Sequence, residues 1–183
     1  MKLLLRFDDV LLRRGGRQLF EGLDLALGPG EALQVVGPNG SGKSSLIRLA
    51  AGLLRHERGV VERAPLALAD DNVALDRELQ LCRALRFWSH RPEPAMEALG
   101  IAHLADVPVR LLSSGQLKRA ALARVAASGV TLWLLDEPLN ALDADGVDRL
   151  NRIVGAHRAS GGAVLAASHQ PLSGDWRLVD LAQ

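Results

Sequence analysis

The sequence predicts an α/β fold with a mainly parallel sheet, in one domain that covers residues 1–183. Two apolar runs, VTLWLL and GAVLAAS, are separated by a helical stretch from about Asp143 to Arg158, which is the spacing of parallel strands joined by a crossover helix. A third apolar run, EALQVV, leads through a glycine-rich loop into a stretch with helical periodicity. The composition, with 48% hydrophobic and 23% charged residues, is that of an ordinary globular chain.

The first third of the chain predicts a strand, a turn, a buried strand and a helix in that order. Apolar and polar residues alternate from Leu23 to Leu27, and Gly28-Pro29-Gly30 turns the chain before EALQVV. Behind the glycine-rich loop, apolar side chains recur at helical spacing, and they are Leu46, Ile47, Leu49, Ala50, Leu53 and Leu54.

The middle of the chain, from about Asp76 to Gly129, is predicted to be all-helical. In LCRALRFW the leucines and the tryptophan fall on one face of a helix, and Pro92 and Pro94 are expected to end that helix. Such a helical segment between two strand-rich parts has the organisation of an inserted subdomain.

Charge, cysteine content and hydropathy disfavour some classes of function for this chain. The net charge is +1, which does not favour a nucleic-acid binder. The single cysteine, Cys82, has no partner for an internal disulfide and is expected to be a buried core thiol. Arg6, Asp8 and Asp9 interrupt the N-terminal leucines, so these lack a signal-peptide core, and no apolar run approaches the roughly 18 residues of a membrane span. If the protein acts at a membrane, other chains are expected to hold it there.

The stretch LLSSGQLKR admits two interpretations. Ser113 with Gln116 makes a capping box, and Leu112 with Leu117 is spaced as a hydrophobic staple, so local helix chemistry alone explains it. A helix start with two serines and a glycine also leaves backbone N–H groups pointing outward, where the helix dipole favours an anion. The stretch by itself does not decide between a plain helix start and a phosphate site.

The glycine-rich loop carries the most specific motif of the chain. GPNGSGKS, residues 37–44, matches G-x-x-x-x-G-K-[ST] and lies between a predicted strand and a predicted helix, as this motif requires. In such a P-loop the backbone N–H groups surround phosphates, Lys43 reaches the β- and γ-phosphate oxygens, and the Ser44 hydroxyl binds magnesium. The alternative is a glycine-rich turn without a ligand, which the strand–loop–helix context disfavours.

Two acidic residues and a histidine are predicted at the carboxyl ends of parallel strands. VTLWLLDEP positions Asp136 to order the magnesium shell and Glu137 to polarise a water that attacks the γ-phosphate. His169 follows GAVLAAS, and a parallel neighbour of the Asp136 strand would deliver it to the same crevice, where it could bond the γ-phosphate or the water. The alternatives are a strand end that merely exposes two charges and a surface histidine.

The order of these motifs resembles the ATP-hydrolysing domain of ABC transporters. The P-loop, LLSSGQ, LLDEP, NALD and a terminal histidine follow one another as in that family, over nearly the whole chain. The resemblance implies a P-loop NTPase fold with an antiparallel N-terminal β subdomain and an inserted helical subdomain over residues 73–128. It also implies that the signature, Leu112 to Gln116, caps the γ-phosphate held by the P-loop of a second copy, and that Asp143 lies in the loop that communicates across the dimer.

The resemblance further implies ATP and Mg²⁺ as cofactors and assigns residues to each role. The catalytic residues expected from it are Glu137, His169 and Lys43. The expected magnesium ligands are Ser44, Asp136 and Asn72. The expected nucleotide contacts are Gly37, Pro38, Asn39, Gly40, Ser41, Gly42, Lys43, Ser44, Ser45, Arg14, Ser113, Ser114, Gly115 and Gln116.

Three positions depart from the family pattern. Asn72 stands where the family has a glutamine that links magnesium to the membrane-facing subdomain, and because it is one methylene shorter, coordination would need a water or a small shift. Ser114 replaces the second signature glycine and keeps the N–H donor. The chain has no tyrosine, and Arg14 stands nearest to the position of the aromatic residue that stacks on adenine, where a guanidinium could stack instead.

Flanking phrases are similar to one subfamily, the ATP-binding subunits of haem exporters in bacterial cytochrome c maturation. Among these phrases are LRFW, LWLLDEPLNALD and SHQPL. The similarity implies integral-membrane partner subunits of a haem-handling complex and ATP-driven release of a haem-loaded periplasmic chaperone. It implies a place on the cytoplasmic face of the bacterial inner membrane, held there by the partners, with a second copy of the chain and without nucleic acid.

Two other functions fit part of the pattern. A soluble ATPase of the same superfamily that acts on nucleic acid or ribosomes would share the motifs, but the balanced charge and the lack of a basic aromatic surface disfavour it. A nucleotide-binding module without turnover would tolerate Asn72 and Ser114.

Overall fold

The computed structural model describes residues 2–181, so the predicted domain ends at 1 and 183 lie just outside the described residues. Within this range the chain divides into two compact units. The first unit comprises residues 2–68, 130–137 and 157–181, and the second comprises residues 69–129 and 138–156. The second unit includes residues 73–128, for which an inserted helical subdomain is predicted.

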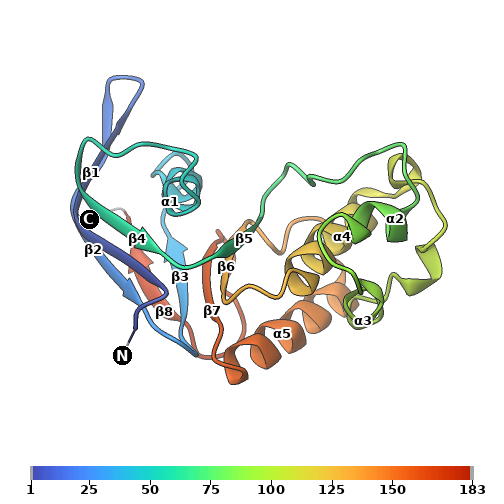
Figure 1. Ribbon diagram of the computed structural model, residues 1–183. Helices are drawn as coiled ribbons and strands as arrows, with labels where there is room; N and C mark the ends of the chain where they lie inside the picture. The colour runs from blue at the N-terminus through green and yellow to red at the C-terminus, as the bar shows by residue number, and fades with distance from the viewer. Residues whose placement is uncertain (1, 182–183) are drawn as a thin grey trace. The chain divides into compact units, whose positions relative to one another are not determined.

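The first unit is built from two sheets and one helix (Figure 1). Its elements are β1 (Leu5–Arg14), β2 (Arg17–Leu27), β3 (Ala32–Val36), α1 (Lys43–Ala50), β4 (Arg58–Arg63), β5 (Leu66–Ala69), β6 (Leu132–Asp136), β7 (Ala163–Ala167) and β8 (Arg177–Asp180). A three-stranded antiparallel sheet has the order β2-β1-β4, and a five-stranded sheet has the order β5-β6-β7-β3-β8. In the larger sheet β6 pairs with β7, and β3 pairs with β7 and β8, all in parallel. The mainly parallel sheet and the antiparallel N-terminal strands are therefore confirmed.

The central strands of the larger sheet form the floor of one hydrophobic core. Every residue of β6 and β7 is buried, as expected for near-continuous apolar runs in a parallel sheet. The helix α1 packs against β6 and β7, and its Leu46, Ile47 and Leu49 enter the core. Apolar residues of β1 and β2 belong to the same cluster. This core holds the start of α1, and hence the loop before it, in a fixed relation to the ends of β6 and β7.

A two-residue turn, Gly15-Gly16, joins β1 to β2. Both glycines have positive φ, 58° and 75°, which a type I′ turn requires and which glycine adopts without steric cost. The antiparallel register continues as far as Arg14 opposite Arg17. The tight turn thereby fixes the position of Arg14 at the end of the hairpin.

The helix α1 is shorter than predicted. It ends at Ala50, and Gly52 follows with φ +78°, a left-handed conformation that commonly ends helices. A Cβ on Gly52 would lie 2.3 Å from Nη2 of Arg63, so the end of that arginine side chain would have to move aside. The prediction that Leu53 and Leu54 continue the helical face is therefore wrong, and Leu53 is exposed.

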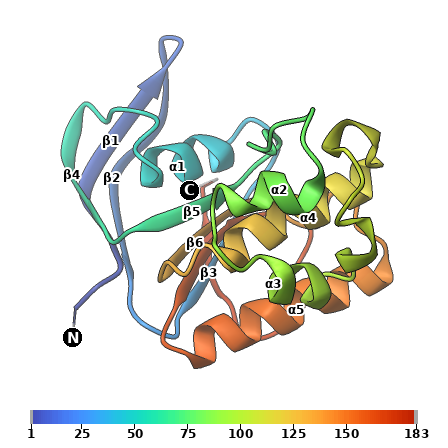
Figure 2. The same ribbon diagram turned by 45° about the vertical axis from the view of Figure 1, so that its right-hand side comes forward.

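The second unit is helical, as predicted for residues 76–129 (Figure 2). Its elements are α2 (Leu81–Arg86), α3 (Glu93–Ala98), η1 (Ala102–Leu104), η2 (Val109–Leu111), α4 (Ser114–Ala127) and most of α5 (Ala144–Ala159), the predicted crossover helix between β6 and β7. Both α2 and α3 pack on α4.

Cys82 on α2 is half-buried and not in the core, contrary to the prediction, and burial raises the pKa of its thiol. Within residues 2–181, every helix is too short or too polar to cross a membrane.

Pro92 and Pro94 begin a helix instead of ending one, which corrects the prediction. The helix α2 already ends at Arg86. Pro92 is the N-cap of α3 and Pro94 lies in its first turn, where a missing N–H costs no helical hydrogen bond. Trp88 consequently lies beyond α2 and not on its apolar face.

His157, near the end of α5, stacks on Trp133 of β6. The ring centroids are 3.8 Å apart and the planes differ by 11°. Nε2 of His157 lies 3.2 Å from the carbonyl oxygen of Thr131 and donates to it. Burial is the main influence on the pKa of His157 and lowers it, while hydrogen bonds with the backbone of Thr131 and Ala163 oppose this shift. His157 therefore resists protonation in the folded chain.

We expect the stability of the protein to fall as the pH drops below the ordinary histidine pKa of about 6.5. In that range the unfolded chain takes up a proton at His157, whereas the folded chain, with its lowered pKa, does not, so protonation favours unfolding. The loss is at most about 1.4 kcal/mol per pH unit, and the partial exposure of the ring reduces it. Urea unfolding at pH values of about 7.5 and 5.5 measures it.

The substitution His157→Gln tests the assignment, because glutamine keeps a donor for Thr131 and does not titrate. Its stability should change less between the two pH values than that of the parent chain. His90→Gln, at an exposed position, is the control and should retain the parent's pH dependence. An unaltered pH dependence in His157→Gln would contradict the prediction.

Candidate functional site

The loop between β3 and α1 is a cradle of backbone groups. Gly37, Gly40 and Gly42 have φ values of 140°, 81° and 106°, in the left-handed region that favours glycine. A Cβ on Gly37 would lie 2.8 Å from Oγ of Ser41, whereas one on Gly40 would meet no atom within 4 Å. Gly42 is the N-cap of α1 and offers no side chain to its first N–H groups. The first N–H groups of α1 therefore have no side-chain cap, and free N–H groups at a helix start favour an anion.

Lys43 and Ser41 determine the charge and polarity of the cradle. Lys43 is 7% exposed, and its Nζ donates to the carbonyl oxygens of Gly37 and Pro38 at 2.7 and 3.0 Å. An ammonium group has three N–H bonds, so one remains for a further acceptor. Oγ of Ser41 is buried and has no hydrogen-bond partner among the residues that the structure describes. Because a buried hydroxyl without a partner is costly, these residues fit a phosphate group whose oxygens would satisfy it.

A hollow of about 340 Å³ opens beside the cradle. Its lining residues are Arg14, Leu19, Asn39, Gly40, Gly42, Lys43, Ser44, Ser45 and Glu137. Arg14, predicted to stack on adenine, thus lies on the wall of the same hollow as the P-loop. Leu19 was not predicted, because a lone leucine near a hairpin end has no sequence signature. Folding brings Leu19 against Gly42: a Cβ added to Gly42 would lie 3.4 Å from the Cβ of Leu19.

Asp136 and Glu137 stand at the end of β6, beside the cradle. Asp136 is buried, and its Oδ1 accepts a hydrogen bond from Oγ of Ser44 at 3.0 Å. Glu137 has a φ of +46°, and its N–H donates to the carbonyl oxygen of Ala167 at 2.8 Å, so the chain leaves the sheet while it stays bonded to β7. Hydroxyl and carboxylate oxygens are ligands that Mg²⁺ prefers, so Ser44 and Asp136 fit a magnesium ion beside bound phosphate.

His169 contacts Glu137 across the ends of β6 and β7. Asp136 is in register with Ala167, and His169 follows two residues later. Nδ1 of His169 lies 2.8 Å from Oε2 of Glu137, and the backbone N–H of His169 donates to the same oxygen at 3.4 Å. Nε2 of Gln170, which can only donate, lies 3.4 Å from Nε2 of His169, and this fits the tautomer with its proton on Nδ1. The two strand ends therefore bring an acid and its hydrogen-bond donor together.

Gln34 supports this pair from the neighbouring strand β3. Its side chain is 2% exposed, with Nε2 donating to the carbonyl oxygen of Gln170 at 2.7 Å and Oε1 accepting from the N–H of Leu172 at 3.1 Å. These bonds hold the loop after His169 against the sheet. The sequence interpretation missed Gln34, although a polar residue inside EALQVV is a usable signal, because a buried amide needs partners.

The signature segment forms a separate cluster in the second unit. Ser113 is the N-cap of α4: its Oγ accepts from the N–H of Gln116 at 3.3 Å, and Oε1 of Gln116 accepts from the N–H of Ser113 at 2.9 Å. The predicted capping box is therefore confirmed, and it leaves the N–H groups of Ser114 and Gly115 outside its bonds. A Cβ on Gly115 would lie 2.8 Å from the carbonyl oxygen of Ala141, and a hollow of about 470 Å³ is lined by both residues.

Asp143, in the loop before α5, is held in its charged form. Its Oδ1 accepts from the N–H of Gly146 at 2.9 Å and forms an ion pair with Arg119. The hydrogen bond from Gly146, followed by that from Arg119, holds the pKa of Asp143 below its usual range. Asp143 is therefore a hydrogen-bond acceptor throughout the neutral pH range.

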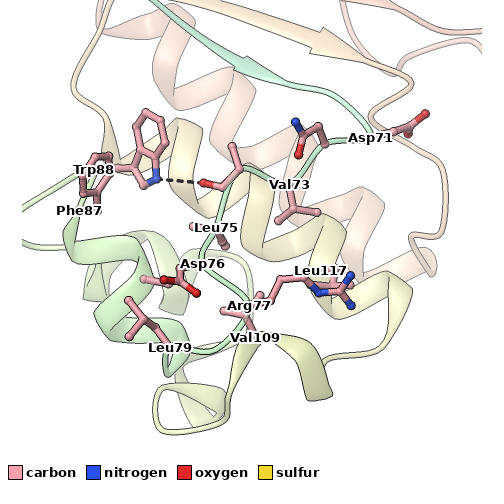
Figure 3. A pocket seen from close by; sticks show the side chains of 13 residues that line it. Asp71, Val73, Leu75, Asp76, Arg77, Leu79, Phe87, Trp88, Val109 and Leu117 are labelled. Atoms are coloured by element: carbon pink, nitrogen blue, oxygen red, sulfur yellow. Dashed lines mark hydrogen bonds between the residues drawn. The ribbon is translucent and has the colours of Figure 1, made fainter.

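Asn72, a predicted magnesium ligand, belongs to the second unit. Its N–H donates to Oδ1 of Asp70 at 3.1 Å, and the residue lines a hollow of about 580 Å³ whose walls appear in Figure 3. The other two predicted ligands, Ser44 and Asp136, belong to the first unit. Of the three predicted magnesium ligands, Ser44 and Asp136 are therefore the two that the structure brings into contact.

Comparisons with known proteins agree with the motifs. Residues 20–140 match the family model described as ABC transporter. The chain is 54% identical over 181 residues to the cytochrome c biogenesis ATP-binding export protein CcmA of Sphingopyxis alaskensis, with 94% of this chain and 93% of that protein covered. It is 55% identical over 171 residues to the protein of the same name from Novosphingobium aromaticivorans, with 90% and 88% covered.

Two solved structures share the fold. One, described as the structure of the ATP binding subunit of an ABC transporter, has a TM-score of 0.83 at 21% identity and covers 91% of this chain and 79% of its own. The other, a nucleotide-free ATP-binding cassette from an ABC transporter, has a TM-score of 0.77 at 19% identity and covers 92% and 82%. These likenesses confirm the predicted α/β fold class.

Proposed function

Because the chain belongs to the ABC transporter family, we propose that it is the ATP-hydrolysing subunit of a membrane complex in cytochrome c biogenesis. Its class, a nucleotide-binding ATPase of the ABC transporter type, follows from the family and the fold. The assignment to cytochrome c biogenesis rests on the curated relatives, which carry that process in their names. Hydrolysis rests on one observation: Glu137, bonded to His169, lines the same hollow as the P-loop.

ATP is the nucleotide that we assign to the hollow of the first unit. Its phosphates would accept from the backbone N–H groups of the P-loop, from the remaining N–H of Lys43 and from the hydroxyl of Ser41. Its base would lie toward Arg14 and Leu19, a guanidinium plane and an aliphatic side chain. Mg²⁺, held by Ser44 and Asp136, would neutralise charge on the phosphates.

Glu137 acts as the general base in this proposal. It takes a proton from a water molecule while the water oxygen bonds to the γ-phosphorus and the bond from that phosphorus to the bridging oxygen breaks, which yields ADP and phosphate. His169 engages Oε2 of Glu137 through Nδ1 and its backbone N–H, so it orients the carboxylate and leaves Oε1 for the water. Lys43 contributes positive charge beside the phosphates.

We assign the other half of each nucleotide site to a second copy of the chain. The N–H groups of Ser114 and Gly115 lie at the positive end of the α4 dipole, which favours the γ-phosphate. Residues 73–128 are then the inserted helical subdomain that carries this signature, and Asp143 lies in the loop beside it. Such a site is complete only when two copies close on each other. Turnover then depends on the motion of the partner that binds residues 73–128.

The hollow of Figure 3 is the docking site that we propose for integral-membrane partner subunits. Phe87 is 83% exposed and Trp88 41%, and a wall with two exposed aromatic rings is typical of protein interfaces. The indole N–H of Trp88 donates to the carbonyl oxygen of Ala74 at 3.2 Å, and the guanidinium of Arg124 on α4 lies 4.7 Å from its ring centroid. A partner segment in this hollow would therefore press on a side chain that contacts the signature helix.

This docking would hold the chain on the cytoplasmic face of the bacterial inner membrane. The membrane subunits would couple closure of the dimer to haem handling and to release of a haem-loaded periplasmic chaperone. The partner segment is expected to carry apolar side chains for Phe87 and Trp88 and charges that complement Asp71, Asp76 and Arg77, which line the same hollow.

We expect Glu137→Gln to keep ATP binding and to lose turnover by at least about 100-fold, because the phosphates stay positioned while the water loses its base. His169→Asn carries an amide near the position of Nδ1 and should keep part of the activity. His169→Gln, whose amide reaches the position of Nε2, should lose about 100-fold, because Glu137 is no longer oriented. Phosphate release by the chain with its membrane partners, together with calorimetric titration of ATP, measures these effects.

The control for these variants is Asp148→Asn, at an exposed position on α5, which should keep the parent's rate. Hydrolysis near the parent rate in Glu137→Gln would overturn its assignment as the base. Higher activity in His169→Gln than in His169→Asn would mean that Nε2 acts directly on the phosphate or the water.

Ser113→Arg should leave ATP affinity at the P-loop unchanged and abolish ATP-driven dimer formation, because an arginine at the start of α4 blocks a phosphate of the other copy. Loss of the helix cap lowers the free energy of unfolding by about 1 kcal/mol. Thermal unfolding of the variant is therefore measured as well, to show that it is folded. Light scattering with ATP in the Glu137→Gln background detects the dimer. Ser173→Arg, at an exposed serine of the first unit, is the matched control. Loss of ATP affinity in monomeric Ser113→Arg would refute the arrangement across two copies.

Phe87→Asp should abolish co-purification of the chain with integral-membrane proteins from solubilised membranes, because a charge replaces an exposed apolar ring at the interface. ATP binding should be unaffected. Leu178→Asp is the control, since Leu178 is 62% exposed on β8 of the first unit. Recovery of the parent chain with nucleic acid and without membrane proteins would contradict the proposed setting.

A further inference from the structure

Arg119 of α4 connects three segments of the second unit. Its side chain is 12% exposed, and Nη1 donates to the carbonyl oxygen of Leu99 at 3.1 Å and to Oδ2 of Asp145 at 2.8 Å. Nη2 pairs with Oδ1 of Asp143. One guanidinium therefore joins the signature helix, the C-terminal end of α3 and the residues that begin α5.

The segments that Arg119 joins border the hollow of about 470 Å³, and behind it they approach one another closely at Gly146. A Cβ on Gly146 would lie 3.0 Å from Oδ1 of Asp143 and 3.2 Å from Nε of Arg119. Ala141, whose carbonyl oxygen lies against Gly115, has a φ of +64°, which is strained for a residue other than glycine. Other contacts must hold this loop in its conformation, and Asp143, at the end of the loop, is bound by Arg119 and by the N–H of Gly146.

Arg149 on α5 makes contacts similar to those of Arg119 and can be compared with it. Its Nε pairs with the same Oδ2 of Asp145 at 2.7 Å, and its Nη1 donates to the carbonyl oxygens of Glu97 and Ala98 at 3.3 and 3.2 Å. Over residues 2–181, no bond of Arg149 reaches Asp143. The two arginines thus share Asp145 and the end of α3, and they differ in their link to the loop.

We propose that Arg119 is a positioning residue that fixes the loop of residues 138–143 against the start of α4. The N–H groups of the signature and the carboxylate of Asp143 then meet a second copy of the chain as one preformed surface. The role of the second copy rests on the proposed function, whereas the fixed loop is a property of the single chain. The planar guanidinium of Arg119 bridges two carboxylates and a carbonyl with its fixed fork of donors, which the compact ammonium of a lysine lacks.

Hydrogen exchange of the backbone amides of residues 139–142 in the full chain tests the fixed loop. We expect Arg119→Gln to accelerate exchange there by about tenfold or more, since the loop loses its anchor. Arg119→Lys should lie between Arg119→Gln and the parent. Arg149→Gln, which removes the same kind of group from the same acid, should leave the loop as in the parent. Unchanged exchange in Arg119→Gln, or equal acceleration in Arg149→Gln, would overturn the proposal.

ATP-driven dimer formation and hydrolysis by the same variants test the consequence. Arg119→Gln should lower kcat by about tenfold while KM and the ATP affinity of the monomer stay within about twofold, because the P-loop is untouched. Arg149→Gln should keep the parent's kcat. If Arg119→Gln does not fold, Arg119→Lys decides, and exchange and kcat equal to the parent's would refute the need for a guanidinium. A parent chain that does not dimerise with ATP would refute the proposed function, while the exchange result would still decide the role of Arg119.

Discussion

The parallel pairing of β6, β7 and β3 is the constraint on which the candidate site depends. Parallel strands end at the same edge of a sheet, so residues that follow them meet there whatever their separation in sequence. Ser44 and Asp136 are 92 positions apart and share a hydrogen bond of 3.0 Å. The same edge carries Glu137 and His169, because Asp136 stands in register with Ala167. The hydrophobic core under α1 keeps these loops in place, since α1 packs against β6 and β7.

Local rules of stability are broken at several residues in or beside the motifs. Ser41 keeps a buried hydroxyl without a partner among the described residues, and Lys43 holds a buried charge against loop carbonyls. Glu137 and Ala141 adopt positive φ without being glycine. Such features persist only where the surrounding structure holds them, and they concentrate where a ligand completes the arrangement. Here they fall in the P-loop, at the end of β6 and in the loop beside the signature.

Each unit organises its own cluster by a different kind of interaction. In the first unit, strand pairing and a buried amide, Gln34, position the acid and the histidine. In the second unit, a capping box and the guanidinium of Arg119 position the start of α4 and the loop before α5. A site that combined the first-unit cluster of one chain with the second-unit cluster of another would therefore have each half already in place in its own chain. The complete site would form only when the two chains associate.

The sequence by itself determined the elements whose physics is local. Four features were predictable because each depends on neighbouring residues. They are the apolar runs of strand length, the crossover stretch, the P-loop between strand and helix, and the capping box at Ser113. The end of α1 and the role of Pro92 were not. The positive φ of Gly52 stops α1 while the apolar spacing continues, and α2 ends at Arg86, before Pro92 begins α3. Tertiary structure alone decided that Leu19 borders the P-loop hollow, that Gln34 holds the loop after His169 and that Arg119 reaches Asp143. Those contacts join residues far apart in the chain, and only the folding of each unit around its own buried residues brings them together.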